Sequence, residues 1–92
     1  MALFKIIETP GFLDDLTQDF GGQQKQIKEK LTNFVYPQLE NQPYFGPNIK
    51  KLHDYHSPTW RYRIGNYRFF YEIDGKTNRV IMIAARHRQE AY

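Results

Sequence analysis

One stretch decides the fold of this chain: Trp60-Arg61-Tyr62-Arg63-Ile64-Gly65-Asn66-Tyr67-Arg68-Phe69-Phe70-Tyr71-Glu72-Ile73. Apolar and charged side chains alternate in it with period two, on either side of the pair Gly65-Asn66. Such alternation is typical of β-strands, and glycine at the first central position suits a type II′ turn. The stretch therefore predicts a β-hairpin in which Arg63 faces Arg68 on the neighbouring strand.

The two faces of this hairpin have opposite characters, because side chains on a strand point alternately to either side of the sheet. One face is apolar and holds Trp60, Tyr62, Ile64, Tyr67, Phe69, Tyr71 and Ile73. The other, called the arginine face below, holds Arg61, Arg63, Arg68, Phe70 and Glu72. Like charges placed side by side on a sheet repel one another, which is unfavourable unless an anion binds among them. The arginine face is therefore a candidate phosphate-binding surface.

Length and composition favour a single domain over residues 1–92. The chain is 40% hydrophobic and 16% aromatic, which argues against disorder and is ample for one core. It has no cysteine, which excludes disulfides and thiolate zinc sites, and the loop histidines His53 and His56 lack a supporting ligand pattern. No apolar run is long enough to span a membrane, and residues 1–5 do not have the form of a signal peptide. We expect a soluble, cytoplasmic protein that needs no metal or other cofactor.

Charge is distributed unevenly along the chain, whose net charge is +3. Residues 1–48 carry four lysines against six carboxylates, whereas residues 49–92 carry nine basic against four acidic side chains. Every arginine lies after residue 60. The planar guanidinium group matches phosphate and stacks on bases, so this bias favours a nucleic-acid or phosphate partner. The alternative is a strand face with scattered, solvated charge.

The first half of the chain predicts a strand followed by two helices. Residues 3–8 are β-prone, and Thr9-Pro10 has the form of a helix N-cap and first helical residue. Helical spacing predicts that the first helix buries Phe12, Leu13, Leu16 and Phe20, and the second Ile27, Leu31, Phe34 and Val35. Pro37 is expected to kink or end the second helix near Tyr36, although Leu39 allows a further turn.

Two further strands complete the expected sheet. Residues 49–52 predict a short edge strand, and the continuously apolar run 79–85 predicts a strand in the middle of the sheet. The order of elements predicts an α+β fold: an N-terminal strand, a two-helix hairpin and an antiparallel three- to four-stranded meander packed on the helices. If the helices cover the aromatic face of the hairpin, the arginine face is left open to solvent.

These residues resemble the RelE/ParE toxin superfamily. The resemblance rests on the hairpin at residues 60–73, on Pro43-Tyr44-Phe45-Gly46-Pro47-Asn48-Ile49-Lys50-Lys51-Leu52, on the apolar last strand and on His87-Arg88-Gln89-Glu90-Ala91-Tyr92. It implies a RelE-like fold and a toxin of a type II toxin–antitoxin system, neutralised by an antitoxin protein that wraps it.

The branches of this superfamily imply different targets. The RelE branch implies a metal-independent endoribonuclease that binds the ribosome and cleaves messenger RNA by attack of a 2′-OH on the adjacent phosphate. The ParE branch implies inhibition of DNA gyrase without RNA cleavage, and a catalytically silent relative that only binds its antitoxin is a third reading. The ending from His87 to Tyr92 favours the RelE branch.

The resemblance also implies roles for the basic residues of the hairpin. Arg68 matches the arginine of the family that stabilises the phosphate, although a simple ion pair with Glu72 is the alternative. Arg61 and Arg63 match catalytic positions that are often lysine in RelE-type enzymes. Because arginine stays protonated in proteins, these side chains can hold charge but cannot accept a proton. The identity of the general base is therefore left open.

The C-terminal segment supplies the remaining expected catalytic residues. His87 is the natural base, since imidazole titrates near neutral pH and some members of the branch carry a histidine there; an inert surface histidine is the alternative. Arg88 matches the basic residue after the last strand, and Tyr92 matches a tyrosine that stacks on a base or orients the 2′-OH. The residues expected to contact RNA or the ribosome are Lys50, Lys51, His53, His56 and Arg86.

Overall fold

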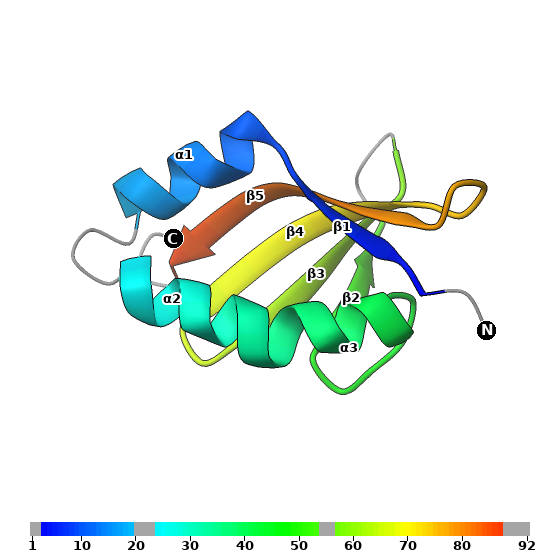
Figure 1. Cartoon of the computed structure of the whole chain (residues 1–92), viewed down its shortest axis with the longest axis horizontal. Helices are drawn as coiled ribbons and strands as arrows, with labels where there is room; N and C mark the ends of the chain where they lie inside the picture. Colours follow the sequence, from blue (N-terminus) through cyan, green and yellow to red (C-terminus); the bar gives the residue numbers. More distant parts are fainter. Residues whose placement is uncertain (1–2, 20–23, 54–56, 88–92) are drawn as a thin grey trace.

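The computed structural model describes residues 3–19, 24–53 and 57–87. Their elements follow in the order β1 (Lys5–Glu8), α1 (Pro10–Asp19), α2 (Gln24–Lys30), the π-helical turn η2 (Leu31–Val35), α3 (Tyr36–Asn41), β2 (Ile49–Leu52), β3 (Thr59–Ile64), β4 (Tyr67–Asp74) and β5 (Arg79–His87). Figure 1 shows the strands as one twisted sheet, with the helices along one of its faces. The expected α+β fold is confirmed.

The described strands form a five-stranded sheet in the order β1-β5-β4-β3-β2. Strands β2 to β5 make an antiparallel meander, and β1 pairs in parallel with β5 at the outer edge. The predicted meander is therefore confirmed, and the apolar strand β5 lies inside the sheet, between β1 and β4, as expected. The short strand β2 lies at the opposite edge, as expected.

The β3–β4 hairpin has the register that its sequence predicts. Arg61 is paired with Phe70, and Arg63 with Arg68. Gly65 has a φ of +57°, and Asn78 is the only other residue in the described part of the chain with positive φ, so the turn has type II′ geometry. A Cβ at Gly65 would meet nothing within 4 Å, so the glycine is needed for its backbone conformation rather than for space.

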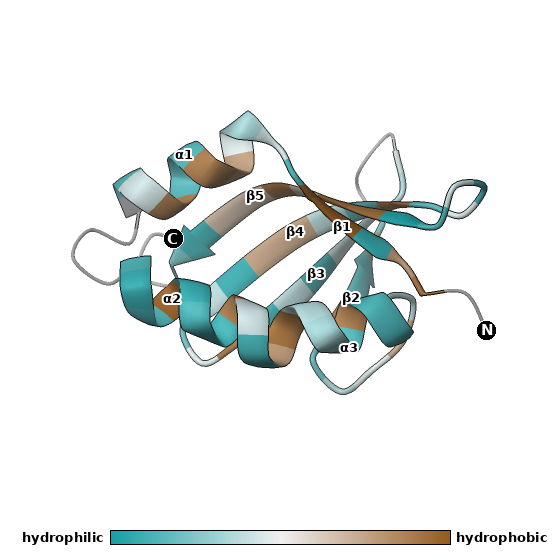
Figure 2. Ribbon diagram, viewed as in Figure 1, coloured by the Kyte–Doolittle hydropathy of each residue, from teal (hydrophilic) through white to brown (hydrophobic). Residues whose placement is uncertain are grey.

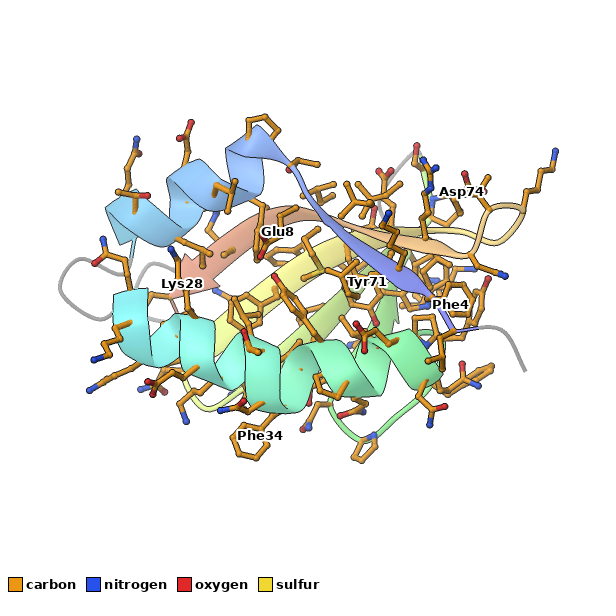
Figure 3. The ribbon with its side chains drawn as sticks, viewed as in Figure 1. Phe4, Glu8, Lys28, Phe34, Tyr71 and Asp74 are labelled. Carbon is orange, nitrogen blue, oxygen red and sulfur yellow. The ribbon has the colours of Figure 1, made fainter. Side chains whose placement is uncertain are left out.

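The core fills the space between the helices and the aromatic face of the hairpin. Figure 2 shows apolar residues recurring along the helices and along the strands beside them. The buried hydrophobic side chains are Phe12, Leu16, Ile27, Leu31, Val35, Leu39, Trp60, Tyr62, Phe69, Tyr71, Val80, Met82 and Ala85. Tyr71 lies between the sheet and the helices (Figure 3), where its hydroxyl donates a hydrogen bond of 2.8 Å to the carbonyl of Pro43. The arginine face is thus left without a helix over it.

The second predicted helix passes through Pro37 instead of ending at Tyr36. The N–H of Tyr36 bonds to the carbonyl of Leu31, five residues back, as a π turn requires. Pro37 then falls in the first turn of α3, where its missing N–H is tolerated, and the helix continues to Asn41. The π turn therefore allows the helix to continue past the proline that was expected to kink or end it.

The same π turn explains why Phe34 is not buried. The buried residues of this helix are spaced four apart, at Ile27, Leu31, Val35 and Leu39. An α-helix has 3.6 residues per turn, so side chains spaced four residues apart would shift gradually around the helix axis. The π turn has more residues per turn and reduces this shift. Phe34 is 61% exposed and points away from the sheet (Figure 3), so its predicted burial is wrong.

Helix α1 covers the part of the β5 edge that β1 leaves unpaired. The side chain of Thr9 accepts the N–H of Phe12, which confirms the predicted N-cap, and donates to the carbonyl of Met82 on β5. Leu13 is 41% exposed, so its predicted burial is wrong, because this short helix turns only Phe12 and Leu16 into the core. The predicted core residue Phe20 lies outside the described residues.

Candidate functional site: a basic hollow on the open face

The helix-free face of the sheet carries rows of basic side chains across neighbouring strands. The strand register, in which directly opposite residues share a face, defines two such rows. They are Lys50–Arg61–Phe70–Ala84 and Arg63–Arg68–Arg86. No helix covers this face (Figure 1), so both rows lie on the open side of the sheet. The predicted gathering of arginines on one open face is therefore present.

A hollow of about 460 Å³ opens on this face where β2, β3 and β4 lie side by side. It is lined by Lys50, Lys51, Leu52, His53, Arg61, Arg68 and Phe70 and is called the arginine hollow below. Its described lining residues include no carboxylate and four cationic residues, of which Lys51 turns its ammonium group toward Trp60 on the other face. A concave site with convergent charge of one sign concentrates counter-ions of the other sign. The arginine hollow is therefore suited to an anionic ligand.

Two guanidinium groups in the hollow each have one buried nitrogen that makes no hydrogen bond. The Nε atoms of Arg61 and Arg68 are inaccessible to solvent and make no hydrogen bond. Leaving a buried donor unpaired costs about 1–3 kcal/mol, and more for a charged group. Within residues 3–19, 24–53 and 57–87, Glu72 forms no ion pair with Arg68, so this alternative is not realised there. An oxyanion bound in the hollow between the two guanidinium groups would offset the charge of both.

The other basic residues expected at the site have different surroundings. Lys51 lines the hollow and also places its Nζ 5.5 Å from the ring centroid of Trp60, a cation–π contact at the edge of the core. Arg63 is exposed and lies beside Arg68 without lining the hollow. Its charge contributes to the electrostatic field around the hollow, but its side chain does not line the hollow.

Arg86 is held by a carboxylate of helix α1. Its Nη1 lies 2.6 Å from Oδ2 of Asp15, and the same oxygen accepts the N–H of Ala85 at 3.0 Å. One carboxylate therefore satisfies a strand-edge donor and neutralises the third arginine of its row. The expected contact of Arg86 with RNA stays a prediction, but the structure gives this side chain a role in joining α1 to β5.

His87 lies on the opposite side of the sheet from the arginine hollow. It is paired with Tyr67, and the two ring centroids are 5.1 Å apart, on the side covered by the helices. The register therefore does not bring His87 together with Arg68, and its expected role as base stays a prediction. Three other expected site residues, His56, Arg88 and Tyr92, lie outside the described residues.

Sequence reasoning gave His53 and Phe70 less weight than their positions deserve. His53 follows the edge strand β2 and supplies the only imidazole among the described lining residues of the hollow. The sequence places it in a loop after the edge strand, and the pairing of β2 with β3 then brings it to the arginines. The alternation of the hairpin places Phe70 on the arginine face. An aromatic residue among arginines on an open face was the available signal.

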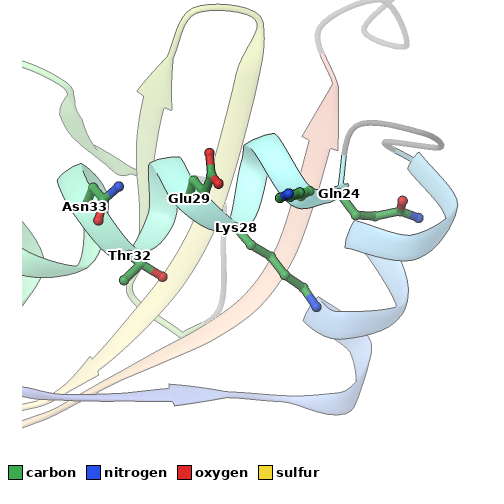
Figure 4. A pocket seen from close by; sticks show the side chains of 6 residues that line it. Gln24, Lys28, Glu29, Thr32 and Asn33 are labelled. Carbon is green, nitrogen blue, oxygen red and sulfur yellow. The ribbon is translucent and has the colours of Figure 1, made fainter.

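A second hollow, of about 560 Å³, lies on the helical layer and is lined by Gln24, Lys25, Lys28, Glu29, Thr32 and Asn33 (Figure 4). Lys28 extends toward α1 in this view. Its lining side chains carry charges of both signs and are mostly exposed, so no recognition chemistry converges there. Among the described residues, no three histidine, aspartate or glutamate side chains gather as a metal site requires. Nor does any described helix have the length and apolarity needed to cross a membrane.

Solved toxins have a similar fold. The chain is similar to the toxin–antitoxin complex RelBE2 of Mycobacterium tuberculosis, with 23% identity over 98% of this chain and 97% of that chain and a TM-score of 0.78. It is also similar to the RelB–RelE antitoxin–toxin complex of Methanococcus jannaschii, with 30% identity over 94% of both chains and a TM-score of 0.62. A YoeB/ParE toxin of Agrobacterium tumefaciens shares 21% identity over 91% of this chain and 98% of that chain, with a TM-score of 0.71.

Sequence comparison identifies the family. No curated protein matches the sequence. The family model of the ParE toxin of type II toxin–antitoxin systems, parDE, matches residues 9–92. This match covers nearly the whole chain, and the similar solved structures include toxins bound to antitoxins. The chain therefore belongs to the RelE/ParE superfamily and is a toxin of a type II toxin–antitoxin system.

Proposed function

We propose that this toxin is a metal-independent endoribonuclease that cleaves messenger RNA on the ribosome. The observation that supports the proposal is the convergence of Arg61 and Arg68 on one hollow whose described lining has no carboxylate. A phosphodiester supplies anionic oxygens that pair well with guanidinium groups. The target on the ribosome follows from the resemblance to the RelE branch.

The proposed reaction needs charge stabilisation and two proton transfers. The 2′-oxygen forms a bond to phosphorus, the bond from phosphorus to the 5′-oxygen breaks, and a 2′,3′-cyclic phosphate and a 5′-OH result. Arg61 and Arg68 stabilise the negative charge that develops on the phosphate oxygens in the transition state. A base takes the proton of the 2′-OH, and an acid protonates the departing 5′-oxygen.

His53 is the residue of the hollow that can transfer a proton. Imidazole titrates near neutral pH, whereas arginine does not release its proton under these conditions. His53 lines the same hollow as the two arginines and is exposed at its edge, where a ribonucleotide can reach it. His87 is the second candidate, at the end of the sheet, and Arg88 and Tyr92 are proposed to complete the site from the segment that follows β5.

Inhibition of DNA gyrase is the second candidate function. It is supported by the matching family model, which is that of the ParE toxin. In this case the arginine face binds a target and carries out no chemistry, so His53 is dispensable. The two candidates therefore differ in whether an imidazole is required.

Parallel assays of purified toxin separate the two functions. The first maps new 5′ ends on a short messenger RNA bound to ribosomes, and the second measures supercoiling by DNA gyrase. We expect cuts within codons for the wild type, and a loss of roughly 100-fold or more in rate for Arg68→Met. Arg79→Met is the matched control, because Arg79 is exposed on the same sheet outside the hollow. Intact messenger RNA together with inhibited gyrase would refute the endoribonuclease proposal.

The same cleavage assay identifies the proton-transfer residue. If His53 acts as base or acid, His53→Gln slows cleavage and changes its dependence on pH between about pH 5 and 8, whereas His87→Gln does neither. The reverse result would assign proton transfer to His87 and exclude His53.

A further inference from the structure

We infer that Phe70 is a stacking platform for the base of the nucleotide whose phosphate is bound by Arg61 and Arg68. This inference rests on the proposed function, because it takes the ligand of the arginine hollow to be single-stranded RNA. It adds a subsite for the base to the subsite for the phosphate.

The first observation is the position of Phe70 within the hairpin. The other aromatic residues of β3 and β4 face the helices and belong to the core or pack against it: Trp60, Tyr62, Tyr67, Phe69 and Tyr71. Phe70 points to the opposite face and provides the only phenyl ring among the described lining residues of the hollow. Because no helix covers this face, the Phe70 side chain is only partly buried. A large apolar ring with no covering element is a candidate contact for a partner.

The second observation concerns the neighbours of Phe70 across the sheet. Its Cα partner on β3 is Arg61, and its partner on β5 is Ala84. Directly opposite side chains on paired strands start about 4.5–5.5 Å apart at Cβ. A guanidinium group for a phosphate and a ring for a base are thus adjacent, at a spacing that one nucleotide can span.

The third observation is a β-bulge at this position. The register changes from Phe70 opposite Ala84 to Tyr71 opposite Met82, so that Ile83 has no partner on β4. Bulges twist a strand locally and re-aim side chains, and they are frequent beside active sites. Here the bulge is at the junction between the core aromatic Tyr71 and the open-face aromatic Phe70.

These observations define the chemical class of the ligand. A phenyl ring offers a π face to any base, so stacking on it tolerates different sequences, as in proteins that bind single strands. A base in a duplex is already stacked and paired, so it cannot lie on the ring. The subsite is therefore expected to accept an unpaired base, as in an exposed codon, and to reject double-stranded RNA.

The ordinary structural role of Phe70 is packing on the sheet surface between Arg61 and Ala84. Phe70→Leu keeps an apolar side chain but removes the ring, and Phe70→Tyr keeps the ring. A packing role predicts altered stability with no selective effect on bases, whereas stacking predicts a selective effect on ligands that carry a base. The two roles are thus separable.

The experiment measures the affinity of full-length toxin for three ligands. They are a trinucleotide in which 2′-O-methyl groups prevent cleavage, the same compound without bases, and inorganic phosphate. We expect Phe70→Leu to weaken trinucleotide binding by roughly 5- to 150-fold and Phe70→Tyr to change it little. Binding of the abasic compound and of phosphate stays unchanged in both variants, whereas Arg68→Met weakens binding of all three.

The results also distinguish this inference from the proposed function. Equal affinity of the wild type for the trinucleotide and the abasic compound, or an equal loss for all ligands in Phe70→Leu, would overturn the stacking role. Selective loss of trinucleotide binding in Phe70→Leu, in a toxin that cleaves no messenger RNA on ribosomes, would instead uphold stacking and refute the endoribonuclease.

Discussion

Replacing Arg68 by methionine is expected to make the free toxin more stable while it removes function. Arg68 has a buried Nε without a partner and lies directly opposite Arg63. The unpaired donor costs about 1–3 kcal/mol, and the like-charge pair adds about 0.2–1 kcal/mol. Methionine keeps most of the aliphatic stem. Because part of the guanidinium group still meets solvent, we expect the free energy of unfolding to rise by about 1–2 kcal/mol.

Urea unfolding of the free toxin at low ionic strength measures this gain. Each kcal/mol corresponds to about 4–8 °C in Tm for a domain of this size, so thermal unfolding checks the same prediction. The control is Arg79→Met. Arg79 lies opposite Asp74, where a hydrogen bond with Thr77 and the charge of Arg79 lower the pKa of the Asp74 carboxyl. Removing this favourable partner is expected to reduce stability slightly.

Measuring the stability of wild type and Arg68→Met in added phosphate tests the same interpretation a second time. An anion that binds only the folded state raises its stability, so phosphate should stabilise the wild type and narrow its gap to Arg68→Met. If Arg68→Met were less stable than the wild type by more than about 1 kcal/mol, the guanidinium group would be holding the sheet together. The interpretation of Arg68 as a residue kept for an anion would then be wrong.

Three further changes test the fold around the site. Asp15→Asn weakens the contact with Arg86 that joins α1 to β5, so it should cost about 1–3 kcal/mol in urea unfolding. Tyr71→Phe removes the 2.8 Å hydrogen bond to the carbonyl of Pro43 and should cost about 1–2 kcal/mol. Burial raises the pKa of Tyr71 in the folded state, so stability should fall as pH rises above about 10, and less steeply in Tyr71→Phe. Gly65→Ala places a side chain at φ +57° and should cost about 1–2 kcal/mol by thermal unfolding, whereas no loss would exclude the type II′ turn.

The hairpin could be predicted in detail because its signals are local. The alternation of residues 60–73 and the turn residue Gly65 together determine the register, and one residue of slip would have moved the core aromatic side chains to the open face. Phe34 could not be placed in this way. Its position depends on a π turn that adds a residue to one turn of the helix, and the apolar spacing alone does not reveal it.

The relation between His87 and the arginines also depends on a non-local feature. Up to Met82, the even-numbered residues of β5 face the helices. After the unpaired Ile83, the odd-numbered residues Ala85 and His87 face them instead. Without this bulge, His87 would lie on the same face as Arg68, as the sequence interpretation requires. The sequence of this strand has no alternation that reveals such a change of face, because it is apolar at every position from Val80 to Ala85. Its sequence therefore gave no sign that His87 and Arg68 lie on opposite faces.

The most direct test of the arginine hollow as the catalytic site is single-turnover cleavage of messenger RNA on ribosomes. The account predicts fragments with a 2′,3′-cyclic phosphate and a 5′-OH, and no cleavage where the attacking nucleotide lacks its 2′-OH. It also predicts a rate lower by roughly 100-fold or more for Arg68→Met, with Arg79→Met cleaving like the wild type. Cleavage by Arg68→Met at the wild-type rate, or cleavage next to a 2′-deoxynucleotide, would contradict the account.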